Sequence, residues 1–214
     1  MKTGRSFVIV ALVVVVSGLA GGQDYYSSVV VHPNQQVRLN GLQLRTATGG
    51  GPTALVAALE TVIGNPAVCC GENSAFLEMG ALVDHRSLQD IAANLDGKHH
   101  TSGEGRPVYL FAHYLPASSA ENNHIVSDEI VGALKSGQPM LMEWNSRVLI
   151  VNGAIFDEKV YSDGRRDYVI HKLLLLDPTT VDIAPRRTFD REKDDWSQVK
   201  GFLFIRAGDH APGF

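Results

Sequence analysis

The pattern of apolar and polar positions divides the chain into a helical first half and a strand-rich second half. In the first half, apolar residues recur every three or four positions, which is the spacing of an amphipathic helix. The predicted helices of this half cover residues 53–63, 70–83 and 88–95. A further helix is expected to begin at Ser127, because serine is a good helix cap and Asp128 and Glu129 would fill the first turn.

The second half alternates short apolar runs with turn residues. Runs rich in branched apolar residues predict strands over residues 108–115, 140–143, 148–156, 168–176 and 202–205. Near the N-terminus, weaker apolar patterns predict two short strands over residues 29–31 and 36–44. The Asp163-Gly164 pair is typical of a hairpin turn. Helices followed by antiparallel strands are the order of an α+β domain, so we expect an α+β fold.

Capping and turn residues indicate where two of the predicted helices begin or end. Ser87 and Asp90 form a capping-box pattern at the start of the helix over 88–95, and Asp96-Gly97 closes that helix. Residues 98–106 are expected to form a loop. Gly137 and Pro139 follow the last predicted helix and stop it.

The N-terminus has the pattern of a secretory signal peptide. Lys2 and Arg5 precede an apolar run from Phe7 to Val16, and small residues lead to Ala20, where cleavage is expected. The run is short for a spanning helix, so a retained membrane anchor is the weaker alternative. We therefore expect a secreted or periplasmic protein without stable membrane anchoring, with residues 1–20 as the signal peptide, 21–52 as an N-terminal extension and 53–208 as the folded domain.

Composition narrows the classes of function. The 214 residues carry a formal net charge of −4 and no basic cluster, which gives no reason to expect a nucleic-acid partner. His99 and His100 are adjacent, but no cysteine or carboxylate stands at ligand spacing from them. The sequence therefore predicts no metal site and no cofactor.

Cys69 and Cys70, the two cysteines of the chain, are the candidate reactive residues. Cys70 would open the helix over 70–83, where backbone N–H groups and the helix dipole favour a reactive thiolate. Two alternatives stay open. The cysteines could be buried packing residues, or they could close a strained vicinal disulfide that blocks Cys70 until it is reduced.

In several ordered features the chain resembles the papain-like cysteine peptidases, and most closely the bacteriocin-processing, double-glycine branch. The features are Cys70-Gly71 opening a helix, Ser87-Leu88 and Ile91 at the next helix, Gly137-Gln138-Pro139 before a strand, Gly153 ending an apolar strand, and Asp177-Pro178 ending another. The resemblance spans about residues 53–205. It implies a papain-like arrangement, in which N-terminal helices pack on a C-terminal antiparallel sheet.

The resemblance also implies roles for individual residues. Cys70 would be the nucleophile and Asp177 the acid that orients the base, while Asn65 could supply an oxyanion amide one residue after the family's glutamine position. The family's catalytic histidine position, six residues before Gly153, is occupied by Arg147. Arginine stays protonated and cannot accept the thiol proton, although it could form an ion pair with Asp177.

Three functional hypotheses follow. The first is a secreted, catalytically impaired peptidase homologue that binds a peptide or protein. The second is an active thiol hydrolase that uses Cys70 with a base from elsewhere, or with Arg147 stabilising the thiolate. His171 is a poor substitute base, because six residues of strand place it about 20 Å from Asp177. The third is a structural or redox role for the cysteine pair.

Overall fold

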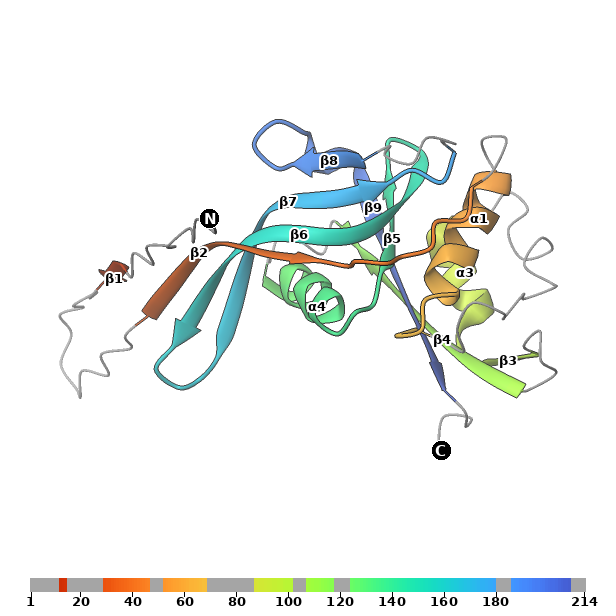
Figure 1. The fold of residues 1–214 in the computed structure, drawn as a ribbon, viewed down its shortest axis with the longest axis horizontal. Helices are drawn as coiled ribbons and strands as arrows, with labels where there is room; N and C mark the ends of the chain where they lie inside the picture. Colours follow the sequence, from red (N-terminus) through yellow and green to blue (C-terminus); the bar gives the residue numbers. More distant parts are fainter. Residues whose placement is uncertain are drawn as a thin grey trace, which may run out of the picture.

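Strand β6, Arg147–Tyr161, is the centre of the sheet (Figure 1). The computed structural model describes residues 12–14, 29–46, 52–68, 87–101, 107–117, 124–179 and 186–208. The other strands are β1 Leu12–Val14, β2 Val29–Arg38, β3 Lys98–Thr101, β4 Pro107–Pro116, β5 Met140–Trp144, β7 Arg166–Leu176, β8 Arg186–Asp190 and β9 Val199–Gly208. The helices are α1 Pro52–Ile63, α3 Leu88–Leu95, α4 His124–Lys135 and the short 3-10 helix Trp196–Gln198.

The strands form one antiparallel sheet in the order β1-β2-β6-β5-β9-β4-β3, with β7 on the other edge of β6 and β8 beside β7. The length of β6 lets it change partners along one edge. Its first part pairs with β5, where Val151 lies opposite Met140, and its second part pairs with β2, where Gly153 lies opposite Arg38. Helices combined with one antiparallel sheet agree with the expected α+β class. The order along the chain differs from the expectation, because β1 and β2 precede α1, and α4 lies between β4 and β5.

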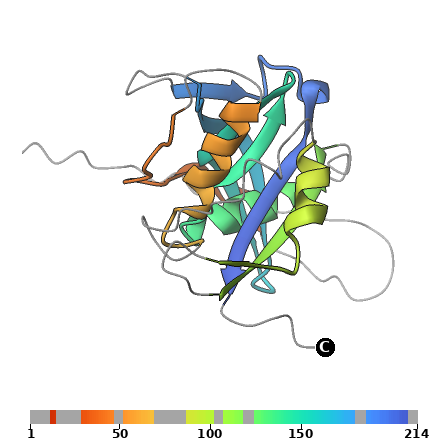
Figure 2. The ribbon, with the colours of Figure 1, turned by 90° about the vertical axis from the view of Figure 1, so that its right-hand side faces the viewer.

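The helices cover both faces of the sheet. Figure 2 shows α1 and α3 in front of the sheet and α4 behind it. Side chains alternate between the two faces, as the pleat of a strand requires. Leu141, Ile150 and Leu203 pack with α1 and α3, whereas their neighbours Met142, Leu149 and Phe202 pack with α4. Burial on both faces explains why these strands are continuous apolar runs in the sequence.

The first two helices that the structure describes agree with the sequence. Helix α1 begins one residue before the predicted start, and its apolar face packs on β5, β6 and β9. Helix α3 has the predicted capping box, in which the Ser87 side chain accepts from the Asp90 N–H and the Asp90 carboxylate accepts from the Ser87 N–H. Local chemistry therefore sets the start of α3.

Helix α4 begins at His124, so the prediction that Ser127 caps it is wrong. Ser127 lies inside the helix and is buried. The helical residues before Ser127 include Val126, which packs into the core with the other apolar residues of α4. Burying that side chain outweighs the preference of serine for a cap. The C-terminal end of α4 is as predicted, because Gly137 follows it with a positive φ of 82°. The Gln138 N–H donates to the Ala133 carbonyl, which completes a Schellman motif.

Three strand predictions need correction. Residues 98–101, expected in a loop, form β3 at the edge of the sheet, where Lys98 pairs with Leu110. The two short strands expected over 29–31 and 36–44 are one strand, β2, which has an irregularity between His32 and Gln35 and ends at Arg38. Gly153 does not end a strand, because β6 continues through it to Tyr161. In each case pairing with a distant strand, rather than local propensity, fixes the strand's extent.

The N-terminal expectations are only partly within the described residues. Leu12–Val14 lies inside the predicted signal peptide and pairs with Val29–Val31 as β1. Cleavage after Ala20 stays a prediction. No helix in the described part of the chain is both long and apolar enough to cross a membrane.

Candidate functional site

Arg147 and Asp177 lie together where β6 begins and β7 ends. The antiparallel register places Ile150 opposite Leu176, so the next residues along both strands converge at this end of the sheet. The Arg147 Nη1 atom lies 3.8 Å from Asp177 Oδ2. The Asp177 side chain is only 2% exposed, whereas that of Arg147 is 59% exposed. The contact between these residues that the sequence led us to expect is present.

Arg187 is a second cation on the same carboxylate. It is carried by β8, which pairs with β7 so that Arg187 lies opposite Leu175. Its Nη2 atom lies 3.3 Å from Asp177 Oδ2. The sequence did not indicate this residue, because β8 was not predicted and only the pairing of β7 with β8 brings Arg187 to Asp177.

The other oxygen of Asp177 is used locally. Asp177 Oδ1 accepts a hydrogen bond from the Thr179 N–H at 3.0 Å and another from the Thr179 hydroxyl. These bonds hold the carboxylate in an Asx turn just after β7. One oxygen therefore faces the turn and the other faces the two arginines.

Aromatic packing holds the hairpin that carries Arg147, one of the three charged residues Arg147, Asp177 and Arg187 that form the cluster. Trp144 lies directly opposite Arg147 across a tight hairpin in which Asn145 and Ser146 both have positive φ values, 51° and 57°. The Trp144 ring packs edge-to-face on Phe189, with centroids 5.2 Å apart. Trp144 is therefore a packing residue that fixes the hairpin from which Arg147 projects.

The charges define what this cluster can do. Two guanidinium groups face the Asp177 carboxylate. Guanidinium groups remain protonated in proteins, so neither arginine can accept a proton from a thiol. Both arginine side chains are more than two-fifths exposed and have donors left for an anionic or carbonyl group of a ligand.

The described histidines with ion pairs lie elsewhere. His171 Nε2 is 3.0 Å from Asp157 Oδ2, a contact between β7 and β6 in the middle of both strands. His113 Nε2 is 3.6 Å from Glu129 Oε2, a contact between β4 and α4. His171 is thus a structural partner of Asp157, six strand residues from Asp177, in agreement with the distance argument from the sequence.

Asn65 lies at the opposite end of the sheet from Arg147. The turn that contains it is tied to the end of β9, where the Ala207 N–H donates to the Val68 carbonyl at 2.9 Å, and to the residues before β5, where Gln138 Nε2 bonds the Ala67 carbonyl. The turn with Asn65 is thus near the start of β5, whereas Arg147 lies opposite Trp144, at the end of β5. The five residues of β5 that separate these two points span roughly 16 Å.

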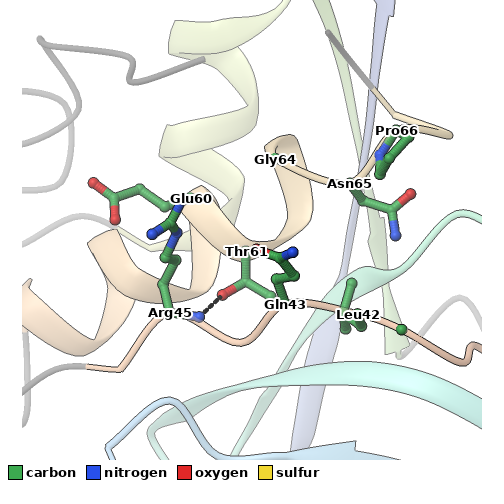
Figure 3. Close-up of a pocket in the computed structure, with 9 residues that line it drawn as sticks. Leu42, Gln43, Arg45, Glu60, Thr61, Gly64, Asn65 and Pro66 are labelled. Atoms are coloured by element: carbon green, nitrogen blue, oxygen red, sulfur yellow. Dashed lines mark hydrogen bonds between the residues drawn. The ribbon is translucent and has the colours of Figure 1, made fainter. Parts of the chain in front are cut away.

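A small pocket surrounds Asn65 at the C-terminal end of α1. Figure 3 shows Asn65 and Pro66 across from Leu42 and Gln43, with the Arg45 N–H bonded to Thr61 Oγ1. The Asn65 side-chain oxygen accepts from the Ala67 N–H at 2.8 Å. The structure therefore does not bring Asn65 together with Arg147 and Asp177. Cys69, Cys70 and the predicted helix over 70–83 lie outside the described residues.

Comparison with known proteins adds no assignment: no protein-family model matches the chain, and a search of curated proteins found no match. Within the ranges that the structure describes, no group of three or more histidine, cysteine, aspartate or glutamate residues could hold a metal ion. The site is therefore defined by its geometry alone, as an arginine–carboxylate cluster at one end of an α+β sheet.

Proposed function

We propose that this protein is a secreted, non-hydrolytic homologue of papain-like cysteine peptidases that binds a peptide or protein. The observation that carries the proposal is the ion pair between Arg147 and Asp177. The resemblance to the family places the general base at residue 147 and its orienting acid at residue 177. An arginine at the first position keeps the contact and removes the base.

Thiol hydrolysis needs a group that takes the proton of the nucleophile and later returns it to the leaving group. Arg147 and Arg187 cannot do so at any pH where the protein is folded. Asp177 is engaged with both arginines and with Thr179. The same groups suit binding, because exposed guanidinium donors can bond the carbonyl and carboxylate oxygens of a peptide.

Alkylation of the reduced protein tests the absence of a catalytic thiolate. The chain without residues 1–20 is treated with iodoacetamide across a pH series, and labelling at each cysteine is read by mass spectrometry. We expect Cys70 to react no faster than Cys69, with the pH dependence of an ordinary thiol, near pH 8.5. Cys69 is the internal control. Rapid labelling of Cys70 well below pH 8 that is lost on unfolding would overturn the proposal in favour of an active thiol hydrolase.

Selection from a displayed random-peptide library tests binding. We expect peptides that bind the immobilised protein and lose affinity for the Arg147→Gln variant, which keeps Arg187 on Asp177. The Arg165→Gln variant is the matched control, since Arg165 is a similarly exposed arginine beside the turn between β6 and β7. Selected peptides that bind all three proteins equally would show that this cluster is not the binding site.

A further inference from the structure

A hollow of about 550 Å³ lies between α4 and the part of the sheet formed by β4 and β9. It exists because α4 packs on β7, β6 and β2 and leaves the neighbouring strands on that face without a helix above them. The volume falls in the range of sites for small organic molecules. This hollow is separate from the cluster around Asp177 and does not depend on the function proposed above.

The floor of the hollow alternates aromatic and basic side chains. Phe111 and His113 come from β4, and Phe204 and Arg206 come from β9. The register places Phe111 opposite Arg206 and His113 opposite Phe204. Each aromatic ring therefore has a basic neighbour directly across the strand pair, so the floor can contact an apolar body and an anionic group together.

The wall of the hollow contains a glycine in the last turn of α4. Gly132 of α4 lines the hollow, and a Cβ built on it would meet nothing within 4 Å. Glycine inside a helix is less favourable than alanine by about 1 kcal/mol. The missing side chain leaves the α4 side of the hollow open.

The charged groups that line the hollow are the carboxylates of Asp96 and Glu129 and the guanidinium of Arg206. His113 faces Glu129 of α4 at 3.6 Å. The Asp96 carboxylate also lines the hollow and accepts a hydrogen bond from the Ala112 N–H. Arg206 has no ion-pair partner among the residues that the structure describes, and it is exposed at the floor of the hollow. A guanidinium without an ion pair among the described residues can form one with a ligand carboxylate.

We propose that this hollow binds a small carboxylate with an aromatic body. The carboxylate pairs with Arg206, and the aromatic group lies against Phe111 and Phe204 under Gly132. The size of an acylated aromatic amino acid fits the volume. Its amide N–H can donate to the side-chain oxygen of Ser136 or Gln138, which follow α4 and whose own donors bond the Gly132 and Ala67 carbonyls.

The test compares N-acetyl-L-phenylalanine with N-acetyl-L-phenylalaninamide, which has the same body without the charge. Binding is followed by titration of the ¹⁵N-labelled protein in NMR spectra. We expect the acid to bind and the amide to bind at least about tenfold more weakly, the scale of one charge-assisted hydrogen bond. The Arg206→Gln variant should lose about the same factor for the acid and none for the amide.

Two variants of Gly132 separate a blocked site from a disturbed fold. Gly132→Leu extends a side chain into the hollow and should weaken binding at least about tenfold, whereas Gly132→Ala should retain it. Thermal unfolding of both variants checks that they fold. The proposal is overturned if acid and amide bind equally, if folded Gly132→Leu binds like the natural chain, or if the acid at about 10 mM, ten times a weak Kd of about 1 mM, does not bind.

Discussion

The Arg147 guanidinium lies 3.8 Å from the Asp177 carboxylate, across the adjacent ends of two antiparallel strands. The carboxylate is almost completely buried, so its charge is stable there only because cations and hydrogen-bond donors surround it. Arg187 contributes the second cation at 3.3 Å. Stability of this end of the sheet is therefore coupled to the charges that also define the proposed binding site.

Removing both arginines should cost far more stability than the two single changes together. Arg147→Gln or Arg187→Gln leaves the other arginine on Asp177 and should lower the free energy of unfolding by about 1 kcal/mol or less. The double variant removes both arginines from a buried carboxylate and should lower it by about 3 kcal/mol or more. Urea denaturation of the three variants at pH 7 measures this coupling, and additive losses would contradict it.

The contact between Lys135 and Glu158 predicts a pH-dependent stability. Lys135 Nζ is 3.1 Å from Glu158 Oε1, joining α4 to β6. Burial would raise the pKa of Glu158, but the hydrogen bond from Lys135 and the charges of Lys135 and Arg166 hold it below its ordinary value of 4.5. A lowered carboxyl pKa adds stability that is present above the unfolded-state pKa and lost as the pH falls through the folded-state pKa.

Glu158→Gln should therefore be less stable than the natural chain by about 1 kcal/mol near pH 7, with the difference shrinking as the pH falls below 4.5. Thermal unfolding of both proteins across this range gives the comparison. Asp163→Asn, a change in the exposed hairpin turn, is a control that should not show this dependence on the Lys135 contact. A difference between Glu158→Gln and the natural chain that stays constant to low pH would contradict the mechanism.

Glycine-to-alanine changes should have opposite effects at two positions. A Cβ on Gly153 would lie 2.7 Å from the Val37 carbonyl oxygen and 2.9 Å from Leu174 Cδ1, so Gly153→Ala should destabilise by about 1–3 kcal/mol. A Cβ on Gly132 meets nothing within 4 Å, so Gly132→Ala should stabilise by up to about 1 kcal/mol. Equal effects in denaturant titrations would show that the strands around Gly153 adjust to a methyl group.

The capping box of α3 should contribute measurably to stability. Ser87→Ala removes the side-chain acceptor of the Asp90 N–H and should cost about 1 kcal/mol. Ser87→Asp keeps an acceptor at the cap and should restore most of the loss. Both variants can be followed by circular dichroism during thermal unfolding, and an unchanged midpoint in Ser87→Ala would mean that tertiary packing alone fixes α3.

Where local chemistry decides the structure, the sequence was sufficient. The capping box at Ser87 set the start of α3, the Asp163-Gly164 pair marked the β6–β7 hairpin, and the apolar runs gave the main strands. These features depend on a few neighbouring residues or on the period of the pleat. The contact of Arg147 with Asp177, by contrast, was expected from the family resemblance and not from a local pattern.

Only the tertiary structure decided which distant segments meet. The pairing of β8 with β7 brought Arg187 to Asp177, and the path of the chain after α1 placed Asn65 at the far end of the sheet. The hollow above Arg206 exists because α4 covers one part of the sheet and not the next. Sequence patterns record which face of an element is apolar, but the partner that buries that face is selected by packing across the whole molecule.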